Sequence, residues 1–283
     1  MARTAVSPLP RDGANGSAQG GARQSLDETR AQWRAAFRHV RGETERRASH
    51  LSAEDQIVQS MADASPTKWH RAHVTWFFET FLLKPHDPSY RIFDERFPFL
   101  FNSYYVAAGP RHARPQRGLI TRPNHADVTG YRAHVDKAVE RLIESVPAAA
   151  APRVFAILEI GLNHEQQHQE LLITDILHAF AQNPTDPAYD AAWQPPRAAQ
   201  GPRGFVEVPA GIHKVGHDGD SGFCFDNETP RHDELIAQVG IARHLVTNAE
   251  WLEFIDAGGY ATPSLWLSDG WATVQAEDWQ APG

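Results

Sequence analysis

The sequence has almost no cysteine, since Cys224 is the only one among 283 residues. One cysteine cannot form a disulfide within the chain, so we expect a protein of the reducing cytoplasm. Long hydrophobic runs are missing too: none reaches the roughly 20 apolar residues of a membrane-spanning helix, and the N-terminus lacks the apolar block of a secretion signal. Positive charge is in deficit, and a formal net charge of -8 argues against a general nucleic-acid binder.

What remains is the composition of a soluble globular protein, with 41% hydrophobic and 10% aromatic residues, and a length that allows two domains. Residues 1–24 are rich in Gly, Ala, Arg and Pro, which predicts a disordered tail. Residues 25–182 carry helical patterns, and residues 183–203 are rich in Pro and Gln, as in a linker. From residue 204 to 283 the chain changes to short strand-like pieces and glycine turns, which indicates a second domain.

Four long helices are predicted in the first domain. Ser25 and Glu28 form a capping-box pattern at the start of the first helix, and Pro66 takes the tolerated first position of a helix that begins at Ser65 and ends near Pro85 and Pro88. The other two are predicted over about 124–145 and 152–182. Residues 86–123 form a long connection whose many aromatic residues predict an ordered structure. In the second domain, Thr247 and Glu250 form another capping box.

Two histidines in the fourth helix have the spacing of a metal-binding pair. His164 and His168 are four residues apart, which places both imidazoles on one helical face. They lie in a stripe that we expect to face inward and that is otherwise largely apolar; its other members are Ile157, Gly161, Leu171, Asp175 and His178. Gly161, one turn before His164, costs about 1 kcal/mol relative to alanine in a helix, which predicts that another group approaches its backbone closely.

A third ligand is expected from the second helix, where His70 and His73 compete. His73 shares a face with Trp69 and Trp76 and is therefore favoured, although a three-residue separation leaves His70 on nearly the same side. Three neutral nitrogen ligands with open metal positions are typical of a catalytic centre. The other histidines are interpreted as surface or hydrogen-bonded residues.

The segment from His164 to His168 also matches the HExxH pattern of zinc proteases, in which Glu165 would be the general base. That interpretation lacks its third ligand, because position 174 is threonine and the next glutamate after Glu170 is Glu207, beyond the linker. We therefore expect Glu165 to lie off the metal, either hydrogen-bonded or facing solvent.

Several separate segments, in order, resemble the sulfoxide synthases of ergothioneine biosynthesis. In the first domain these are SPTKWHRAHVTWFFE (65–79), FNSYY (101–105), GPRHARPQRG (109–118) and HEQQHQE (164–170). In the second domain, FVEVPAG (205–211), DNETPRH (226–232), VTNAEW (246–251) and WLSDGW (266–271) resemble the formylglycine-generating-enzyme part of the same family. The resemblance covers the chain from about residue 25 onward.

The resemblance implies a mainly α N-terminal domain, a DinB-like four-helix bundle, followed by an incomplete α+β domain of C-type-lectin-like, formylglycine-generating-enzyme-like fold. It implies a non-haem Fe(II) centre held by His73, His164 and His168. Dioxygen would then drive the joining of the sulfur of cysteine or γ-glutamylcysteine to hercynine as a sulfoxide.

By the same resemblance, Gln167 contacts the substrate imidazole. Arg111 and Arg114 are candidates for binding the carboxylates of the thiol substrate, because a guanidinium can donate two parallel hydrogen bonds to one carboxylate. Arg117 and Arg122 stay open as alternatives for that role.

The family's second domain continues past the point where this sequence stops, and its catalytic tyrosine is expected beyond Gly283. We therefore expect no catalytic residue within these 283 residues and interpret the chain as a fragment that binds Fe(II) weakly and has little activity alone. Two alternatives stay open. One is a DinB-like thiol transferase or hydrolase that uses zinc or nickel, which the second domain disfavours; the other is a non-catalytic remnant.

Overall fold

A computed structural model describes residues 25–194, 201–219 and 222–282. The chain divides into two compact units, with the division between Gln194 and Pro195. The tail predicted for residues 1–24 lies outside the described residues, as does the part of the predicted linker from 195 to 200. No helix within the described part combines the length and the apolar character needed to cross a membrane.

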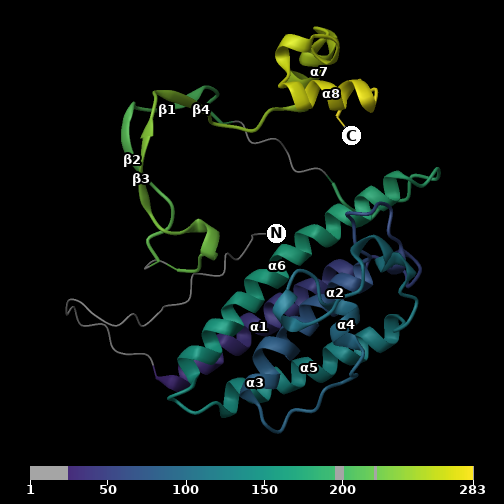
Figure 1. Cartoon of the computed structure of the whole chain (residues 1–283), viewed down its shortest axis with the longest axis vertical. Coiled ribbons are helices and arrows are strands. Elements are labelled where there is room, and N and C mark those ends of the chain that lie inside the picture. Colours follow the sequence, from purple (N-terminus) through teal and green to yellow (C-terminus); the bar gives the residue numbers. More distant parts are fainter. Residues whose placement is uncertain (1–24, 195–200, 220–221, 283) are drawn as a thin grey trace. The chain divides into compact units, whose positions relative to one another are not determined.

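Four long helices make up most of the first unit (Figure 1), which confirms the mainly α fold predicted for this region. They are α1 (Leu26–Ala48), α2 (Thr67–Phe77), α5 (His125–Ser145) and α6 (Ala151–Ala181). Helix α1 packs against α5 and α6, and α2 packs against the same two helices. The connection between α2 and α5 is ordered, as expected, and contains the short helices α3 (Lys84–His86) and α4 (Phe97–Phe101).

Local capping signals set two of the helix starts. The Ser25 hydroxyl accepts a hydrogen bond from the Glu28 backbone N–H, and the Glu28 carboxylate accepts one from the Ser25 N–H, as the capping box predicts. The predicted start of the second helix was wrong by two residues: α2 begins at Thr67, after Pro66. Ser65 does not cap the helix because its N–H donates to Asp175 and its hydroxyl accepts from an arginine side chain.

The helical segment that begins with α2 ends at His86, near Pro85 and Pro88 as predicted, but it is not one regular α-helix. At Phe77 α2 passes directly into a π-helical turn, Phe78–Leu83, which continues into α3. Such turns are rare and occur often near functional sites. The carboxylate of Glu79 within the turn accepts a hydrogen bond of 2.7 Å from the Tyr131 hydroxyl of α5, so the turn is held from the neighbouring helix.

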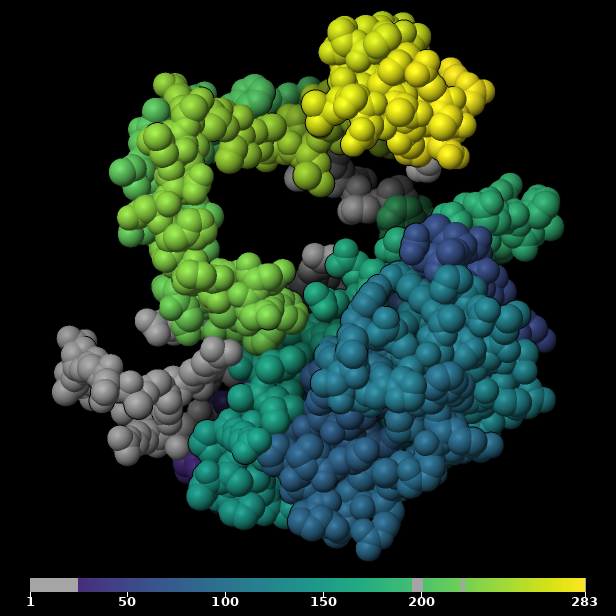
Figure 2. Space-filling view, viewed as in Figure 1, coloured from purple at the N-terminus to yellow at the C-terminus, as the bar shows by residue number. Residues whose placement is uncertain are grey.

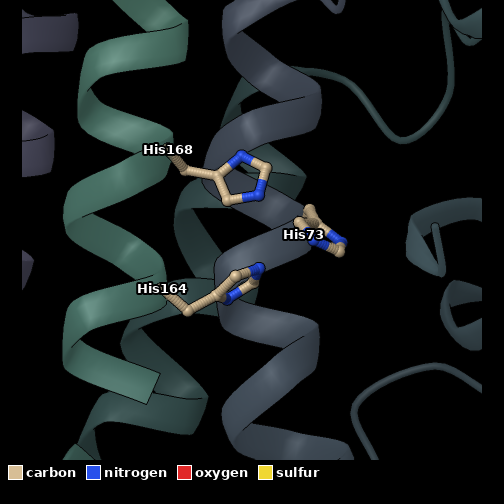
Figure 3. Close-up of side chains that lie close together, drawn as sticks. All are labelled: His73, His164 and His168. Carbon is tan, nitrogen blue, oxygen red and sulfur yellow. The ribbon is translucent and has the colours of Figure 1, made fainter. Parts of the chain in front are cut away.

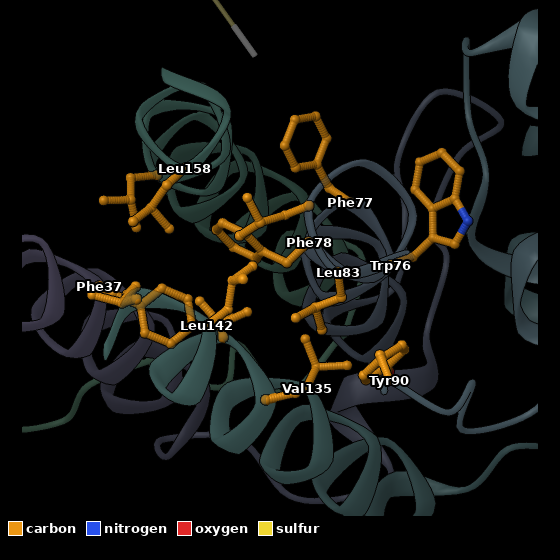
Figure 4. Packing of buried hydrophobic residues seen from close by; sticks show 14 of the residues in the cluster. Phe37, Trp76, Phe77, Phe78, Leu83, Tyr90, Val135, Leu142 and Leu158 are labelled. Atoms are coloured by element: carbon orange, nitrogen blue, oxygen red, sulfur yellow. The ribbon is translucent and has the colours of Figure 1, made fainter. Parts of the chain in front are cut away.

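Aromatic and aliphatic side chains from all four helices form the core (Figure 4). The predicted stripe on α5 is confirmed, since all its members are buried: Val128, Tyr131, Val135, Ala138 and Leu142. The Phe78 ring explains Gly161 of α6. A Cβ atom at Gly161 would lie 2.4 Å from Cε1 of Phe78, so only glycine lets that ring approach the helix so closely. The close approach predicted at Gly161 is therefore confirmed.

The predicted inward stripe of α6 is correct in part: Gly161 and His164 are buried and Ile157 packs against the core, but Leu171 is 44% exposed. The stripe left out other buried residues of α6, which include Leu158, Leu162, Glu165, Gln169, Leu172 and Ile176. Apolar residues occur on more than one face of α6, and a glutamate is not expected in a core, so periodicity placed only part of the buried face. The face that carries His164 and His168 therefore flanks the core-facing stripe.

The described residues of the second unit form two separate antiparallel strand pairs and two short helices, an α+β content as predicted. Strand β1 (Phe205–Val208) pairs with β4 (Val239–Ala242), and β2 (Gly211–Val215) pairs with β3 (His232–Ile236). Helix α7 (Asn248–Asp256) begins at the predicted capping box of Thr247 and is followed by Gly258 in the left-handed region, and α8 is Ser268–Ala276. In the space-filling view the strands, in green, form a thin strip (Figure 2).

Candidate metal centre

The structure brings three histidine side chains from two helices together (Figure 3). His73 comes from α2, and His164 and His168 come from successive turns of α6. Each can offer one ring nitrogen to a common point, and these three nitrogens lie within 4.8 Å of one another. The ring centroids are 4.6 to 5.0 Å apart. We call this group the histidine triad.

Aromatic rings pack against the triad. The His73 ring is stacked between Trp69 and Trp76 of its own helix, with centroid separations of 4.5 and 5.5 Å. The Phe77 ring lies 4.9 Å from the His164 ring, and Tyr105 of the connection lies 6.3 Å from it. His73 and His164 are buried, and His164 is 8% exposed.

Burial keeps the three imidazoles neutral. It lowers the pKa of His164 to about 4. For His73 and His168 burial is again the largest cause, and together with the neighbouring histidines it holds both pKa values well below the ordinary value of 6.5. A metal ion requires a neutral imidazole, so the triad is ready to accept a cation without first releasing protons.

The free ring nitrogens fit a bound cation. The Nδ1 of His73 donates a hydrogen bond of 2.6 Å to the Phe101 carbonyl, which can only accept, so the lone pair of His73 is on Nε2. The Nδ1 of His164 is buried and has no hydrogen-bond partner among the described residues. A buried nitrogen without a partner is costly, and a bound substrate would satisfy it. Three nitrogen ligands suit Fe, Zn, Cu or Ni.

His70, the competing residue of α2, lies beside the triad and does not belong to it. Its Nδ1 is 2.8 Å from Nδ1 of His168, and its Nε2 is 2.9 Å from a carboxylate oxygen of Asp175, also on α6. Both nitrogens of His70 are therefore engaged. Sequence reasoning considered His70 only as a ligand and placed Asp175 only in a stripe; their link to His168 depends on how α2 and α6 pack.

Glu165, between the two histidines of α6, is fully buried and hydrogen-bonded. Arg41 donates to one carboxylate oxygen at 2.9 Å, and Arg132 and Thr44 donate to the other at 3.1 and 2.7 Å. Although burial opposes its ionisation, Arg41 and Arg132 hold the pKa of Glu165 below its ordinary value. The general-base role of the protease pattern is excluded because both oxygens serve this network, and of the two expected settings the hydrogen-bonded one is correct.

The predicted substrate-binding residues lie on the surface around this region. Gln167 is exposed on α6, next to His168 in the sequence, and Arg111 is exposed in the connection. Arg114 is half-buried, and its guanidinium donates to the Tyr104 hydroxyl and to the Asp63 carbonyl. These contacts leave the roles predicted for the three residues untested.

Arg117, which the sequence left as one of two alternatives, has a distinctive setting. It is 5% exposed, and its guanidinium lies 3.4 Å from the ring centroid of Trp69, on which His73 stacks. It donates to the hydroxyls of Ser65 and Ser103, while its Nε has no partner among the described residues. Burial, with Arg114 nearby, lowers the pKa of Arg117 to about 10. Its stacking joins residues far apart in the sequence, so no local pattern identifies it.

Comparison with known proteins matches residues 191–283 to the family model of the sulfatase-modifying factor enzyme 1-like domain. This match agrees with the α+β character of the second unit and with the resemblance found in the sequence. Similarity to longer curated proteins extends over 74 to 77% of the chain and therefore includes a large part of the first unit.

Three such proteins are named hercynine oxygenase. The protein of Mycolicibacterium smegmatis is 30% identical over 221 residues, which is 77% of this chain and 49% of the relative. The proteins of Mycolicibacterium thermoresistibile and Mycobacterium tuberculosis are 31% and 29% identical, over 74% and 77% of this chain and 44% and 49% of their own lengths. The chain thus spans about half the length of the curated relatives it matches.

Proposed function

The chain belongs to the hercynine oxygenase family, and on this basis we propose that its histidine triad holds Fe(II) for an O₂-dependent sulfoxide synthase of ergothioneine biosynthesis. The proposed reaction joins the sulfur of cysteine or γ-glutamylcysteine to hercynine. The observation that carries the proposal is the convergence of His73, His164 and His168, all neutral, on one point.

Bound iron would supply two things, redox chemistry with dioxygen and a template that holds two reactants side by side. The chain's own residues do the rest. Three nitrogen ligands leave further positions open for small molecules. Trp69, Trp76 and Phe77 line the triad, and their ring contacts restrict the histidine rings to few orientations.

We assign the recognition of hercynine to Gln167. Its side chain is exposed on α6, one residue before His168 and three after His164. An amide at that place offers both a donor and an acceptor to a substrate imidazole. Replacing it with Glu keeps the size and removes the donor, so the variant should bind hercynine more weakly while it still binds iron.

The carboxylates of the thiol substrate are assigned to Arg111 and Arg114. Arg117 adds a buried positive charge behind them, and no carboxylate forms an ion pair with it among the described residues. A guanidinium without an anionic partner favours the approach of a negatively charged ligand. This arrangement supports a dicarboxylate or monocarboxylate thiol as the second substrate.

The proposal is tested by anaerobic titration of the metal-free protein with Fe(II), followed by addition of hercynine and of each thiol, and then by O₂ uptake. We expect one equivalent of Fe(II) to bind. His73→Ala should weaken binding by roughly 100-fold or more, because one of three ligands is lost. His39→Ala, an exposed histidine of α1, is the matched control and should leave binding unchanged.

Failure of the wild-type protein to bind Fe(II), or equal losses in His73→Ala and His39→Ala, would contradict the proposed metal site. Preference for zinc together with thiol transfer that needs no O₂ would instead favour the DinB-like transferase. The same O₂-uptake measurement shows whether the 283-residue chain turns over hercynine.

A further inference from the structure

A line of three buried or nearly buried side chains runs from α6 through α2 and back to the triad. It begins at Asp175, which lies two turns after His168 on α6. The Oδ2 of Asp175 accepts a hydrogen bond of 2.7 Å from the Ser65 N–H. The same oxygen is 2.9 Å from Nε2 of His70. The Nδ1 of His70 is 2.8 Å from Nδ1 of His168. We call Asp175, His70 and His168 the relay.

The direction of each hydrogen bond in the relay follows from the chemistry of its first member. A carboxylate oxygen can only accept, so Nε2 of His70 carries the proton. A neutral imidazole has a single N–H, so Nδ1 of His70 has a lone pair and accepts. Nδ1 of His168 must then donate, and the lone pair of His168 is on Nε2. Burial lowers the pKa of His70, which agrees with a neutral ring.

The three histidines of the triad thus differ in what holds their second nitrogen. For His73 it is the backbone carbonyl of Phe101, and for His164 there is no partner among the described residues. Among the three, only His168 has its second nitrogen hydrogen-bonded to another side chain, that of His70, which itself has two tautomers. If His70 carried its proton on Nδ1, His168 would have to accept, its Nε2 would carry hydrogen, and that nitrogen could not bind a metal ion.

We propose that His70, oriented by Asp175, is a positioning residue that fixes His168 as its Nδ1–H tautomer and so presents Nε2 of His168 to the metal ion. The metal part of this inference rests on the proposed function. The tautomer part does not, because it concerns the metal-free protein.

A simpler role is that the relay only ties α2 to α6. The two roles are separated by His70→Asn and His70→Leu, since Asn and Leu have nearly the same size. Asn offers an amide oxygen close to the position of Nδ1 and can accept from His168, whereas Leu cannot. His70→Asn keeps an acceptor for Nδ1 of His168 and His70→Leu does not, so the tautomer of metal-free His168, which a tie between helices does not set, separates the two roles.

His178→Leu is the matched control for the loss of a histidine contact on α6. Nδ1 of His178 lies 2.7 Å from the Ser60 hydroxyl, a contact that crosses to another segment and does not touch the triad. Circular dichroism and thermal unfolding of all three variants establish that each is folded before any comparison of binding.

The first measurement is ¹⁵N NMR of the histidine rings in metal-free protein, with His168 assigned from a His168→Gln variant. We expect Nδ1 of His168 to be protonated and Nε2 unprotonated in the wild type and in His70→Asn. In His70→Leu we expect a shift toward the Nε2–H form. The second measurement is the affinity for Zn(II) and Fe(II), which should fall about 10- to 100-fold in His70→Leu, far less in His70→Asn and not at all in His178→Leu.

The relay is refuted if metal-free His168 carries hydrogen on Nε2, or if His70→Asn and His70→Leu lose affinity equally. It is also refuted if His178→Leu loses as much affinity as His70→Leu. A wild-type protein that shows the expected tautomer and binds no metal would refute the proposed function and the metal part of this inference together. A wild-type protein that binds metal but lacks the Nδ1–H tautomer of His168 would refute this inference and leave the proposed function standing.

Discussion

The two units of this chain differ in what holds their secondary structure. In the helical unit every long helix contributes large buried side chains to one cluster, and the helix that contains His73 is buried throughout. In the second unit the strands are exposed along almost their whole length, and among the described residues beyond 200 only Gly259 and Val274 are buried. Local signals alone are enough to define strands and short helices, but a centre of three converging side chains needs a packed core.

The largest expected difference between the units is in hydrogen exchange of the whole chain. Amides of α2, α5 and α6 should open only with global unfolding, so their protection should exceed about 10⁴, whereas β1 to β4 should be protected by less than about 10². Exchange measured by mass spectrometry with peptide resolution tests this. Equal protection in both units would show that the strand pairs have a core that the described residues lack, and would remove the contrast.

The next largest effect is expected at Glu165. Glu165→Gln removes the negative charge that Arg41 and Arg132 share, so both buried guanidinium groups lose one ion-pair partner. This loss should lower the free energy of unfolding by about 3 to 5 kcal/mol. The matched change in the second unit is Asp233→Asn, which breaks an exposed cross-strand pair with Lys214 and should change stability by less than about 0.5 kcal/mol. Urea unfolding measures both, and similar values would break the comparison.

Acid should destabilise the helical unit through its buried histidines. The pKa of His164 is about 4 in the folded protein, whereas an exposed histidine ring has an ordinary pKa of 6.5, so between these pH values only the unfolded chain binds the proton. The unfolding free energy therefore falls as pH is lowered, by roughly 3 kcal/mol between pH 6.5 and 4. In metal-free protein His164→Gln should lose this part of the pH dependence. Parallel curves for wild type and variant would contradict the burial argument.

The smallest effect sharpens the claim of tight packing in the helical unit. Gly161→Ala places a Cβ against the Phe78 ring and should cost about 1 to 3 kcal/mol, even though alanine favours the helix. Gly42→Ala in α1 meets nothing within 4 Å and should stabilise by up to about 1 kcal/mol. Opposite signs in thermal unfolding support close packing at Gly161; a gain in both variants would show that Phe78 moves aside without cost.

Predictions that depend on neighbours in the sequence were the most accurate. The capping boxes of Ser25 and Thr247 lie within four residues of each helix start, and both are present. The spacing of His164 and His168 likewise places both rings on one side of α6 whatever the rest of the chain does. The helix pattern also predicted His73 on a buried aromatic face, although it left His70 open as the alternative.

Predictions that needed knowledge of a partner helix were less successful. The π-helical turn Phe78–Leu83 has no local sequence signal, and the core-facing side of α6 was predicted only in part because Glu165 is buried by arginines more than 30 residues away. The contact of His70 with Asp175 joins residues 105 positions apart, and the stacking of Arg117 on Trp69 joins residues 48 positions apart. Neither contact could be predicted from one segment alone.

The amino-acid sequence by itself determined the helices, the starting points of those with a capping box and the residue types able to bind a metal, because hydrogen bonding and side-chain spacing along one helix are local properties. The tertiary structure decided which histidine joins the pair on α6, which nitrogen each ring has free, and which charges are neutralised inside the bundle. Those features depend on burial and on distances between helices, and both are established only when the core packs.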